Sequence, residues 1–431
     1  MNRLCTTLLL VLVCFCVRAY TQAHPLAAAQ VPSAVPTAFF EMNMHDFHPW
    51  ALVSFDGVRL WNTGTHWADL NPSKGVYNWT RLDGWISAAQ AHGATEIIYT
   101  IGMTPQWASS NPNDQSCRFG PGQCAPPNDL NADGTGTNEH WKNFVKAIAT
   151  HVGTKVRFWE IWNEPVMSFY WTGTFAQMVR MAKDARTIIL GINPNARFLT
   201  PPNGANIKFA ESWWIGYAEA GGLQYADIIA MHGYVNLPPH TCGNYPQAAN
   251  FVTEVNNLRT ILANYGQSYK SIWDTESSWG QVGMTCFSDP DLQTAFLGQF
   301  YMFHRSMNVK RLYWYAYDDL NTGQLYDPTT GTLLQPGIAL QQVHQWMLGH
   351  TMVQNCASVG TVWTCGFTGP GGYVAESIWN TAKSCSGGVC QTGKVTVANT
   401  FTRYRTLSGK TFSISNHAVP VGAKPIFLDN Q

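Results

Sequence analysis

Eight short runs of apolar residues, spread between residues 39 and 317, constrain the fold of this chain more than any other feature of its sequence. The runs are residues 39–44, 58–61, 96–101, 156–162, 197–200, 228–232, 271–275 and 311–317. Amphipathic stretches with the period of a helix separate them, over residues 141–151, 175–190, 210–220, 246–265 and 291–307. Strands that alternate with helices in this way predict an α/β fold, a (β/α)8 TIM barrel over residues 39–350.

The composition and the pattern of the sequence change on both sides of this region. Residues 351–431 contain short β-like runs separated by Gly, Ser and Pro, which predict a small C-terminal antiparallel β-domain packed against the barrel. Residues 24–38 are rich in Ala, Pro and Val and form a lead-in segment. Residues 1–23 combine Arg3, an apolar run too short to span a bilayer and a small-residue cleavage site, as a signal peptide does. We therefore expect a secreted or periplasmic protein that is not inserted in a membrane.

The cysteines agree with an oxidising compartment. Three of the 11 cysteines lie in the signal peptide, so the mature chain keeps an even number, which favours disulfides. Their spacing suggests these pairs: Cys117 with Cys124, Cys356 with Cys365, Cys385 with Cys390 and, by remainder, Cys242 with Cys286. Zinc binding is the alternative for Cys385 and Cys390. The first pair lies in a Pro-, Gly- and Asn-rich segment, residues 104–137, which follows the third run and is expected on the active-site face.

Charge and aromatic content restrict the partners. The chain has 26 basic residues (Lys and Arg) and 26 acidic residues (Asp and Glu), so its formal net charge is zero. This balance does not suggest a nucleic acid or an anionic membrane as partner. Only 12% of residues are charged, whereas 13% are aromatic, including 18 Trp. Aromatic faces stack on sugar rings, so this composition fits a protein that handles carbohydrate, although most Trp residues of a large chain fill its core.

Two carboxylates stand at the ends of predicted strands. Residues 158–165 read Phe-Trp-Glu-Ile-Trp-Asn-Glu-Pro at the end of the fourth run, where Pro165 stops the strand and leaves Glu164 at its rim. Residues 272–277 read Ile-Trp-Asp-Thr-Glu-Ser at the end of the seventh run, with Glu276 near the rim. Active sites of barrels lie at the carboxyl ends of the strands, so we expect both carboxylates at one mouth.

Such a pair meets the geometric need of glycoside hydrolysis. Retention of configuration requires carboxyl groups roughly 5 Å apart, one that donates a proton and one that attacks the anomeric carbon. Asp274 is an alternative nucleophile, but it lies one pleat deeper than Glu276. Glu160 lies deeper still, and we expect it to form a structural ion pair with Arg157 or Arg59.

With these motifs the chain resembles the large clan of barrel glycosidases often called clan A, which carries Asn-Glu-Pro after the fourth strand and a Glu at the end of the seventh. Residues 57–61 (Gly-Val-Arg-Leu-Trp), 67–72 (Trp-Ala-Asp-Leu-Asn-Pro) and 75–79 (Gly-Val-Tyr-Asn-Trp), with the trailing β-domain, look most like glycoside hydrolase family 39 and its relatives. The resemblance covers nearly the whole mature chain. It implies a retaining hydrolase that cleaves a β-linked oligo- or polysaccharide by double displacement.

The resemblance also implies roles for individual residues. Glu164 would be the general acid/base and Glu276 the nucleophile, while Asn163 would bind the sugar 2-hydroxyl. Arg59, together with His232 or Tyr234, would support the nucleophile. Trp314 would form the floor of the subsite that holds the attacked sugar.

Position alone adds two candidate sugar contacts. His45 ends the first run, and Trp107 follows the third, where it either stacks on a distal sugar or packs in the core. Four histidines (His45, His48, His66 and His232) raise the alternative of a metal site. Because retaining hydrolysis needs no metal, we expect neither metal nor cofactor.

Two further functions are compatible with the same scaffold. A non-catalytic carbohydrate-binding barrel would lack one of the two carboxylates, and both are present here. A transglycosylase would carry both, and it differs from a hydrolase in forming longer glycans from a sugar acceptor. The sequence leaves open this last choice, the sugar, endo or exo action and the oligomeric state.

Overall fold

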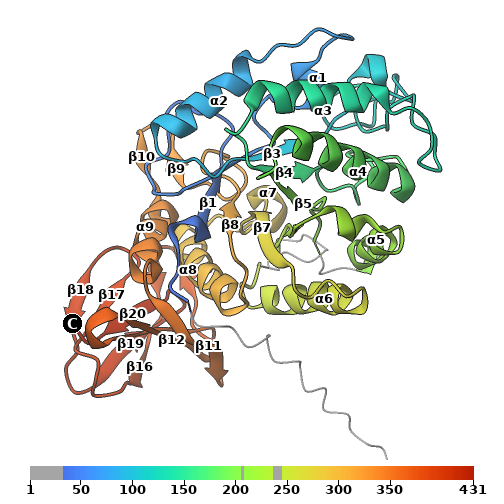
Figure 1. Cartoon of the computed structure of the whole chain (residues 1–431). Helices are drawn as coiled ribbons and strands as arrows, with labels where there is room; N and C mark the ends of the chain where they lie inside the picture. Colours follow the sequence, from blue (N-terminus) through green and yellow to red (C-terminus); the bar gives the residue numbers. More distant parts are fainter. Residues whose placement is uncertain (1–32, 205–207, 236–244) are drawn as a thin grey trace, which may run out of the picture.

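Eight parallel strands close into a barrel at the centre of the computed structural model, which describes residues 33–204, 208–235 and 245–431 (Figure 1). The signal peptide predicted over residues 1–23 lies outside the described residues. The strands are β1 (Phe40–Asn43), β2 (Val58–Leu60), β3 (Ile98–Ile101), β4 (Phe158–Ile161), β5 (Arg197–Leu199), β6 (Ile228–Met231), β7 (Ser271–Ser277) and β8 (Leu312–Trp314). Each overlaps one of the eight apolar runs, so the prediction of a (β/α)8 barrel is confirmed.

Helices surround the barrel. They are α1 (Trp67–Leu70), α2 (Thr80–Ala91), α3 (Glu139–Val152), α4 (Phe175–Ile192), α5 (Lys208–Glu219), α6 (Asn250–Asn264), α7 (Val282–Thr285), α8 (Pro290–Ser306) and α9 (Gln335–Met347). The segment between β1 and β2, all of it described, contains no helix, so the alternation is incomplete there. A small hairpin, β9 (Tyr326–Asp327) with β10 (Thr332–Leu333), precedes α9.

The period of the apolar residues explains why the helices pack as they do. In α3 the buried side chains Trp141, Val145, Ile148 and Val152 recur every three or four residues and therefore form one stripe against the barrel. Strands β1 to β4 are buried along their whole length, as expected of a parallel sheet covered by helices. Strands and helices thus share one large core, and strand residues alone form a second cluster, made of Ile98, Phe158, Leu199, Ile228, Ala230, Trp273 and Tyr313.

A separate layer of antiparallel strands follows α9. One sheet has the order β11 (Thr351–Val359), β12 (Val362–Gly369), β13 (Tyr373–Asn380), β20 (Ile426–Asp429), β17 (Arg403–Thr406) and β18 (Thr411–Ser413). Two separate two-stranded antiparallel sheets accompany it, β14 (Cys385–Ser386) with β15 (Val389–Cys390), and β16 (Gly393–Thr396) with β19 (Ala418–Val421). The small antiparallel β-domain predicted from the sequence is thus confirmed.

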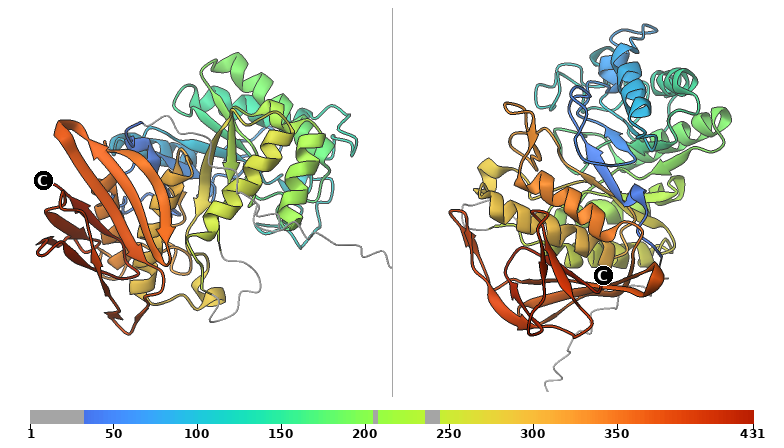
Figure 2. Two further views of the ribbon diagram at one scale, coloured as in Figure 1. Left: turned by 90° about the horizontal axis from the view of Figure 1, so that it is seen from below. Right: turned by 90° about the vertical axis from the view of Figure 1, so that its left-hand side faces the viewer.

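This β-domain lies against α8 and α9, on the side of the barrel where the chain ends (Figures 1 and 2). Phe303 of α8 meets the rings of Trp363 and Trp379 at centroid distances of 5.0 and 5.5 Å. Trp346 of α9 stacks on Phe427 at 5.2 Å. All of these rings except that of Trp363 are fully buried, so the contact is a continuation of the hydrophobic core.

The disulfides match the pairs suggested by spacing. Cys117–Cys124, Cys356–Cys365 and Cys385–Cys390 are bonded. Cys286 is also disulfide-bonded, and Cys242, its predicted partner, lies outside the described residues. The Cys385–Cys390 bond sits across the β14–β15 pair and leaves no thiolates there for zinc. Within the described parts of the chain, no helix is both long and apolar enough to cross a bilayer.

Candidate active site

The two carboxylates meet at the carboxyl end of the barrel. One oxygen of Glu164, one of Glu276 and one ring nitrogen of His232 all lie within 4.8 Å of one another. A retaining pair requires a separation of roughly 5 Å, whereas an inverting pair stands roughly 6.5–9.5 Å apart to admit a water molecule. The observed separation therefore fits the retaining geometry.

An unusual backbone turn brings Glu164 to the mouth. Trp162 and Glu164 both have positive φ angles, 62° and 39°, a conformation that non-glycine residues rarely adopt. The backbone N–H of Glu164 donates to the carbonyl of Pro202, beyond β5, which holds the turn in place. The chain leaves the strand geometry here, so Glu164 lines the cavity while Asn163, one residue before it, contacts Arg59 below the lining.

Arg59 connects the residues beneath the mouth. Its Nη1 donates to Glu276 Oε2 at 2.8 Å, its Nη2 to Asn163 Oδ1 at 2.6 Å and its Nε to Glu160 Oε2 at 2.7 Å. The planar guanidinium supplies these donors in a fixed arrangement. The predicted ion pair of Glu160 is confirmed, with Arg59 as the partner. Since Arg59 occupies the amide oxygen of Asn163, the amide N–H groups of that side chain are left as its donors.

Glu276 is buried and depends on its partners for its charge. Tyr234 donates its hydroxyl to Glu276 Oε1 at 3.0 Å, so both oxygens of the carboxylate accept a hydrogen bond. Burial raises the pKa of Glu276, and the charges of His232 and Arg59 with the Tyr234 hydroxyl offset part of that rise. The carboxylate form of Glu276 is thus the form that this set of neighbours stabilises.

His232 stands between the two carboxylates. Its Nδ1 lies 2.8 Å from Glu164 Oε1, and its Nε2 lies 3.9 Å from Glu276 Oε2. Burial by itself would lower the pKa of His232, but the adjacent Glu276 and Glu164 outweigh it, so the pKa is raised. The resemblance implied that His232 or Tyr234 supports the nucleophile. The structure pairs Tyr234 with Glu276 and places His232 in contact with Glu164.

Asp274, the alternative nucleophile, is buried and accepts hydrogen bonds that hold the strand carrying Glu276 in place. Its Oδ1 accepts the backbone N–H of Glu276 at 3.3 Å, and its Oδ2 lies 2.8 Å from Nε2 of His304 on α8. Asp274 is fully buried and does not line the cavity at the mouth. These contacts fix β7 at the point where it carries Glu276.

A cavity of about 900 Å³ opens above the carboxylates. Of the residues chosen from the sequence, those in its lining are His45, Glu164, His232, Tyr234 and Glu276. Asn163 and Arg59 lie below the lining, in contact with Glu276 or with each other. Trp107 and Trp314 lie outside it.

Both tryptophans have structural surroundings. Trp314 is fully buried and donates its Nε1 to the carbonyl of Gly323 at 2.7 Å. Trp107 is partly buried against the core and donates to the carbonyl of Asn71 at 2.9 Å. The next residue along β8, Tyr315, lines the cavity instead, and its hydroxyl accepts a hydrogen bond from Asn62. The aromatic side chain that lines the cavity just after this strand is therefore Tyr315, which the sequence analysis did not single out.

His45 is held by two neighbours. Its Nδ1 lies 3.0 Å from Asp318, and its Nε2 lies 3.1 Å from the Tyr315 hydroxyl. Burial lowers the pKa of His45, but Asp318 more than compensates, so the pKa is raised. This network links the ends of β1 and β8 on one side of the cavity.

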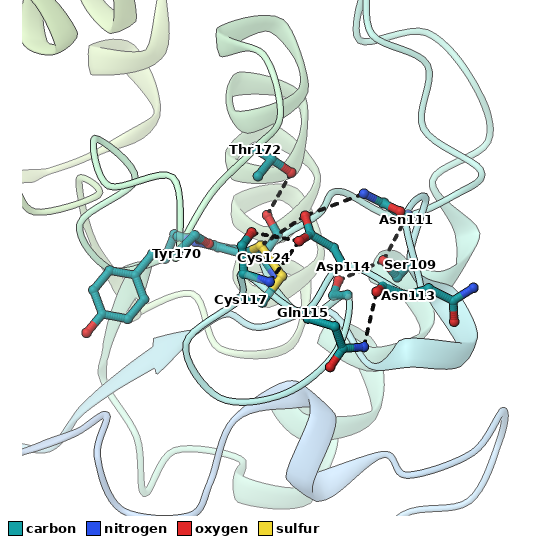
Figure 3. The surroundings of a disulfide bond; sticks show 12 residues. Ser109, Asn111, Asn113, Asp114, Gln115, Cys117, Cys124, Tyr170 and Thr172 are labelled. Carbon is teal, nitrogen blue, oxygen red and sulfur yellow. Dashed lines mark hydrogen bonds between the residues drawn. A yellow bond between two sulfur atoms is a disulfide. The ribbon is translucent and has the colours of Figure 1, made fainter.

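The segment over residues 104–137 forms part of the cavity wall, and Figure 3 shows the Cys117–Cys124 disulfide that closes a loop within it, with Thr172 beside it. The backbone N–H of Thr172 donates to the carbonyl of Cys124 at 2.9 Å, and that of Arg118 donates to the carbonyl of Phe169 at 2.9 Å. These bonds attach the segment to the loop that follows β4. Arg118 and Phe119 consequently reach the cavity.

Among the described residues, two clusters could offer ligands to a metal ion. One is Glu164, His232 and Glu276, in which Glu164 and His232 already share a hydrogen bond. The other is Asp114, Cys117 and Cys124, in which both sulfurs belong to a disulfide. A disulfide sulfur is not a thiolate ligand. Of these two clusters, only Glu164, His232 and Glu276 therefore keeps three groups that can bind a metal ion.

The buried charges of this site predict a large effect on stability. Replacing Arg59 by Met should lower the free energy of unfolding by about 3–5 kcal/mol, because Glu160 and Glu276 would remain buried without their cation. Denaturation in urea measures this loss. Adding Glu160→Gln to the Arg59→Met variant should recover part of it, whereas an equal or greater loss in the double variant would contradict the argument.

Comparisons with known proteins agree on the fold. No family model and no curated protein sequence matches the chain. Among solved structures, a family 39 glycoside hydrolase from Bacteroides cellulosilyticus has a TM-score of 0.66 at 18% identity, covering 91% of this chain and 80% of its own. A monomeric β-xylosidase from Caulobacter crescentus has a TM-score of 0.65 at 14% identity, covering 92% and 97%.

A third structure extends the comparison to another family. A family 30 subfamily 8 xylanase from Clostridium acetobutylicum has a TM-score of 0.56 at 16% identity, covering 90% of this chain and 95% of its own. Most of each chain is covered, so barrel and β-domain are matched together. This chain thus has the fold of glycoside hydrolases of families 39 and 30, the clan A architecture that its sequence motifs resemble.

Proposed function

We propose that this protein is a secreted retaining β-glycoside hydrolase that cleaves a β-linked glycoside by double displacement. The observation that carries the proposal is the pair Glu164 and Glu276, with oxygens within 4.8 Å of each other at the mouth of the barrel. The shared fold with glycoside hydrolases supports it. Fold alone would not, because barrels host many chemistries.

In the first step, a carboxylate oxygen of Glu276 attacks the anomeric carbon. The bond between that carbon and the leaving oxygen breaks, and the oxygen takes the proton of Glu164. The sugar is then covalently bound to Glu276, and Glu164 is a carboxylate. Arg59 and Tyr234 support this step by stabilising Glu276 as an anion before attack.

In the second step, water attacks the same carbon from the side that the leaving group vacated. Glu164 removes a proton from the water, and the bond to Glu276 breaks. The net change is one water consumed and one glycosidic bond cleaved, with Glu164 protonated again. His232 assists both steps through its hydrogen bond to Glu164, which steadies that carboxyl group in either protonation state.

The sugar on which the enzyme acts is expected to sit against the polar groups around Glu276. Tyr315, in the cavity lining, offers an aromatic face to this sugar. Asn163 lies below the lining with its amide oxygen held by Arg59, so its N–H groups remain as donors for the 2-hydroxyl, the role that the resemblance implies. The relatives of similar fold include proteins described as a β-xylosidase and as a xylanase. Xylosides are accordingly the first substrates to test.

A screen of nitrophenyl β-glycosides of common sugars tests the activity, and proton NMR of the first product tests the stereochemistry. We expect the newly released sugar to carry the β configuration before it mutarotates. Release of the α form would contradict the double displacement. Formation of longer glycans in the presence of a sugar acceptor would identify a transglycosylase instead.

The hydrogen bond from Tyr234 to the nucleophile gives a second prediction. Tyr234→Phe should lower kcat/KM by about 10- to 100-fold, because a hydrogen bond to an ionised group contributes about 1.5–3 kcal/mol. Steady-state kinetics on the best nitrophenyl glycoside measure it. Tyr326→Phe, a change of a buried tyrosine outside the cavity lining, should leave kcat/KM near that of the wild type.

Secretion is part of the same proposal. The disulfides support it, since they persist in oxidising compartments. We propose that residues 1–23 are removed on export and that the mature protein is secreted or periplasmic. Mass spectrometry of protein recovered outside the cytoplasm, with a start near His24, tests this.

A further inference from the structure

The wall of the cavity is divided into two unlike sides. Polar side chains come from the segments that follow β7, β8, β1 and β2: Gln281, Asp319, His45, Asn62, His66 and Asp69. Apolar side chains come from the segments that follow β3, β4 and β5: Phe119, Val166, Met167, Phe169, Phe209 and Ala210. These strands are consecutive around the closed barrel, so each set forms one continuous side. The exceptions are Trp61 and Arg118, which lie where the two sides meet, and Tyr170, a polar residue on the apolar side.

The apolar side adjoins the proposed acid. Val166 and Met167 come directly after Glu164 in the sequence, and the backbone N–H of Val166 donates to Asn203 Oδ1 at 3.2 Å. This bond holds the loop after β4 against the loop after β5. The apolar side is therefore fixed relative to Glu164.

The direction in which the nucleophile attacks determines which part of the substrate lies against the apolar side of the cavity. In a retaining reaction the nucleophile approaches the anomeric carbon from the face opposite the leaving group. The leaving group consequently faces Glu164 and lies away from Glu276. The sugar hydroxyls meet the polar side, and the leaving group meets the apolar one.

The apolar side chains are open to a ligand. Phe119, Phe169 and Phe209 are 39%, 39% and 47% exposed, although all line the cavity. A second sugar placed here could stack its C–H surface on the phenylalanine rings. The hydroxyls around its edge would lose water, however, which costs free energy unless they find new hydrogen-bond partners. Within this side of the described lining, Arg118 and Tyr170 are the polar side chains near Glu164. A group without hydroxyls binds such a surface with less loss.

We infer that the leaving group of the natural substrate is an apolar alcohol or phenol, so that the enzyme removes a sugar from an alkyl or aryl aglycone rather than from another sugar. This inference rests on the proposed hydrolase activity and names its substrate class. The chemical step is unchanged: the aglycone oxygen takes the proton of Glu164 and departs as a neutral alcohol.

A series of substrates that differ only in the length of the alcohol tests the inference. The β-glycosides of methanol, butanol and hexanol carry leaving groups of similar basicity, and the sugar is the one identified by the nitrophenyl screen. Burial of one methylene contributes about 0.8 kcal/mol, or about fourfold in kcat/KM. We expect kcat/KM to rise at least about 10-fold from methyl to hexyl, since burial is partial. We also expect the disaccharide of the same sugar to be cleaved more slowly than the hexyl glycoside.

Two matched variants locate the effect. Phe209→Ser should reduce the ratio of hexyl to methyl kcat/KM several-fold. Phe412→Ser alters a phenylalanine of similar exposure, 43%, on β18 of the β-domain, and should leave that ratio unchanged. Both positions are exposed, and thermal melting checks that both variants fold.

Several results would overturn the inference. They are a flat series from methyl to hexyl, a disaccharide cleaved faster than the hexyl glycoside, and an unchanged ratio in Phe209→Ser. Failure to cleave any nitrophenyl glycoside would be a different result, since it would refute the proposed hydrolase activity itself.

Discussion

Glu276→Ala is expected to lower kcat by at least about 10⁴-fold on whichever nitrophenyl β-glycoside the wild-type enzyme cleaves best. Without this carboxylate no covalent intermediate forms, and the space left by the side chain places water too far from the anomeric carbon. Stopped and continuous assays of nitrophenol release measure the loss. Because Glu276 is buried beside Arg59, circular dichroism must accompany the kinetics to show that the variant is folded.

Added azide separates a lost nucleophile from a lost fold. A small anion can enter the space vacated in Glu276→Ala and attack from the same face, so a glycosyl azide of α configuration should form. Glu219→Ala, a change of an exposed carboxylate on α5, should keep wild-type kcat. Normal turnover in Glu276→Ala, or an azide product of β configuration, would remove the assignment of Glu276.

Glu164→Ala should have an effect that depends on the leaving group. Loss of a general acid lowers the rate by about 10²- to 10⁴-fold. The loss occurs only with substrates whose departing oxygen needs a proton. We therefore expect a large drop in kcat/KM for an alkyl glycoside and a small one for a dinitrophenyl glycoside, whose phenolate leaves unaided. Rapid-mixing measurements with the dinitrophenyl substrate should show a burst, since the second step lacks its base.

Azide again provides the control. In Glu164→Ala it should accelerate turnover by attacking the covalent intermediate from the Glu164 side, which gives a glycosyl azide of β configuration. An equal loss on alkyl and dinitrophenyl substrates would mean that Glu164 positions the substrate rather than protonating it. The configurations of the two azide products thus assign the two carboxylates independently.

Local sequence patterns were enough to predict the barrel, because strand and helix periodicity are properties of neighbouring residues. The same holds for Glu164 and Glu276, which stand at positions where a strand ends and the barrel architecture brings such ends together. The pairing of Cys117 with Cys124 could also be predicted, since short spacing left few alternatives.

Long-range contacts could not be predicted in the same way. The resemblance to barrel glycosidases implied Trp314, at the end of β8, as the floor of the sugar subsite, but Trp314 is buried and Tyr315, the next residue, lines the cavity. The partners of His232 and Tyr234 depend on ångström-scale placement of loops after β6. The two unlike sides of the cavity arise from segments far apart in sequence, such as those that carry Phe119 and Phe209, and emerge only when the barrel closes.

The contact between α8 and the β-domain has a consequence for the nucleophile. Phe303 packs edge-on against Trp363 and Trp379. The next residue, His304, lies within hydrogen-bond distance of Asp274, which accepts the backbone N–H of Glu276. A chain shortened to its barrel would leave Phe303 facing water and free α8 to shift. The C-terminal sheet is therefore expected to support the proposed nucleophile from a distance, since none of its residues borders the described cavity. We expect a minimal version of this enzyme to need that sheet.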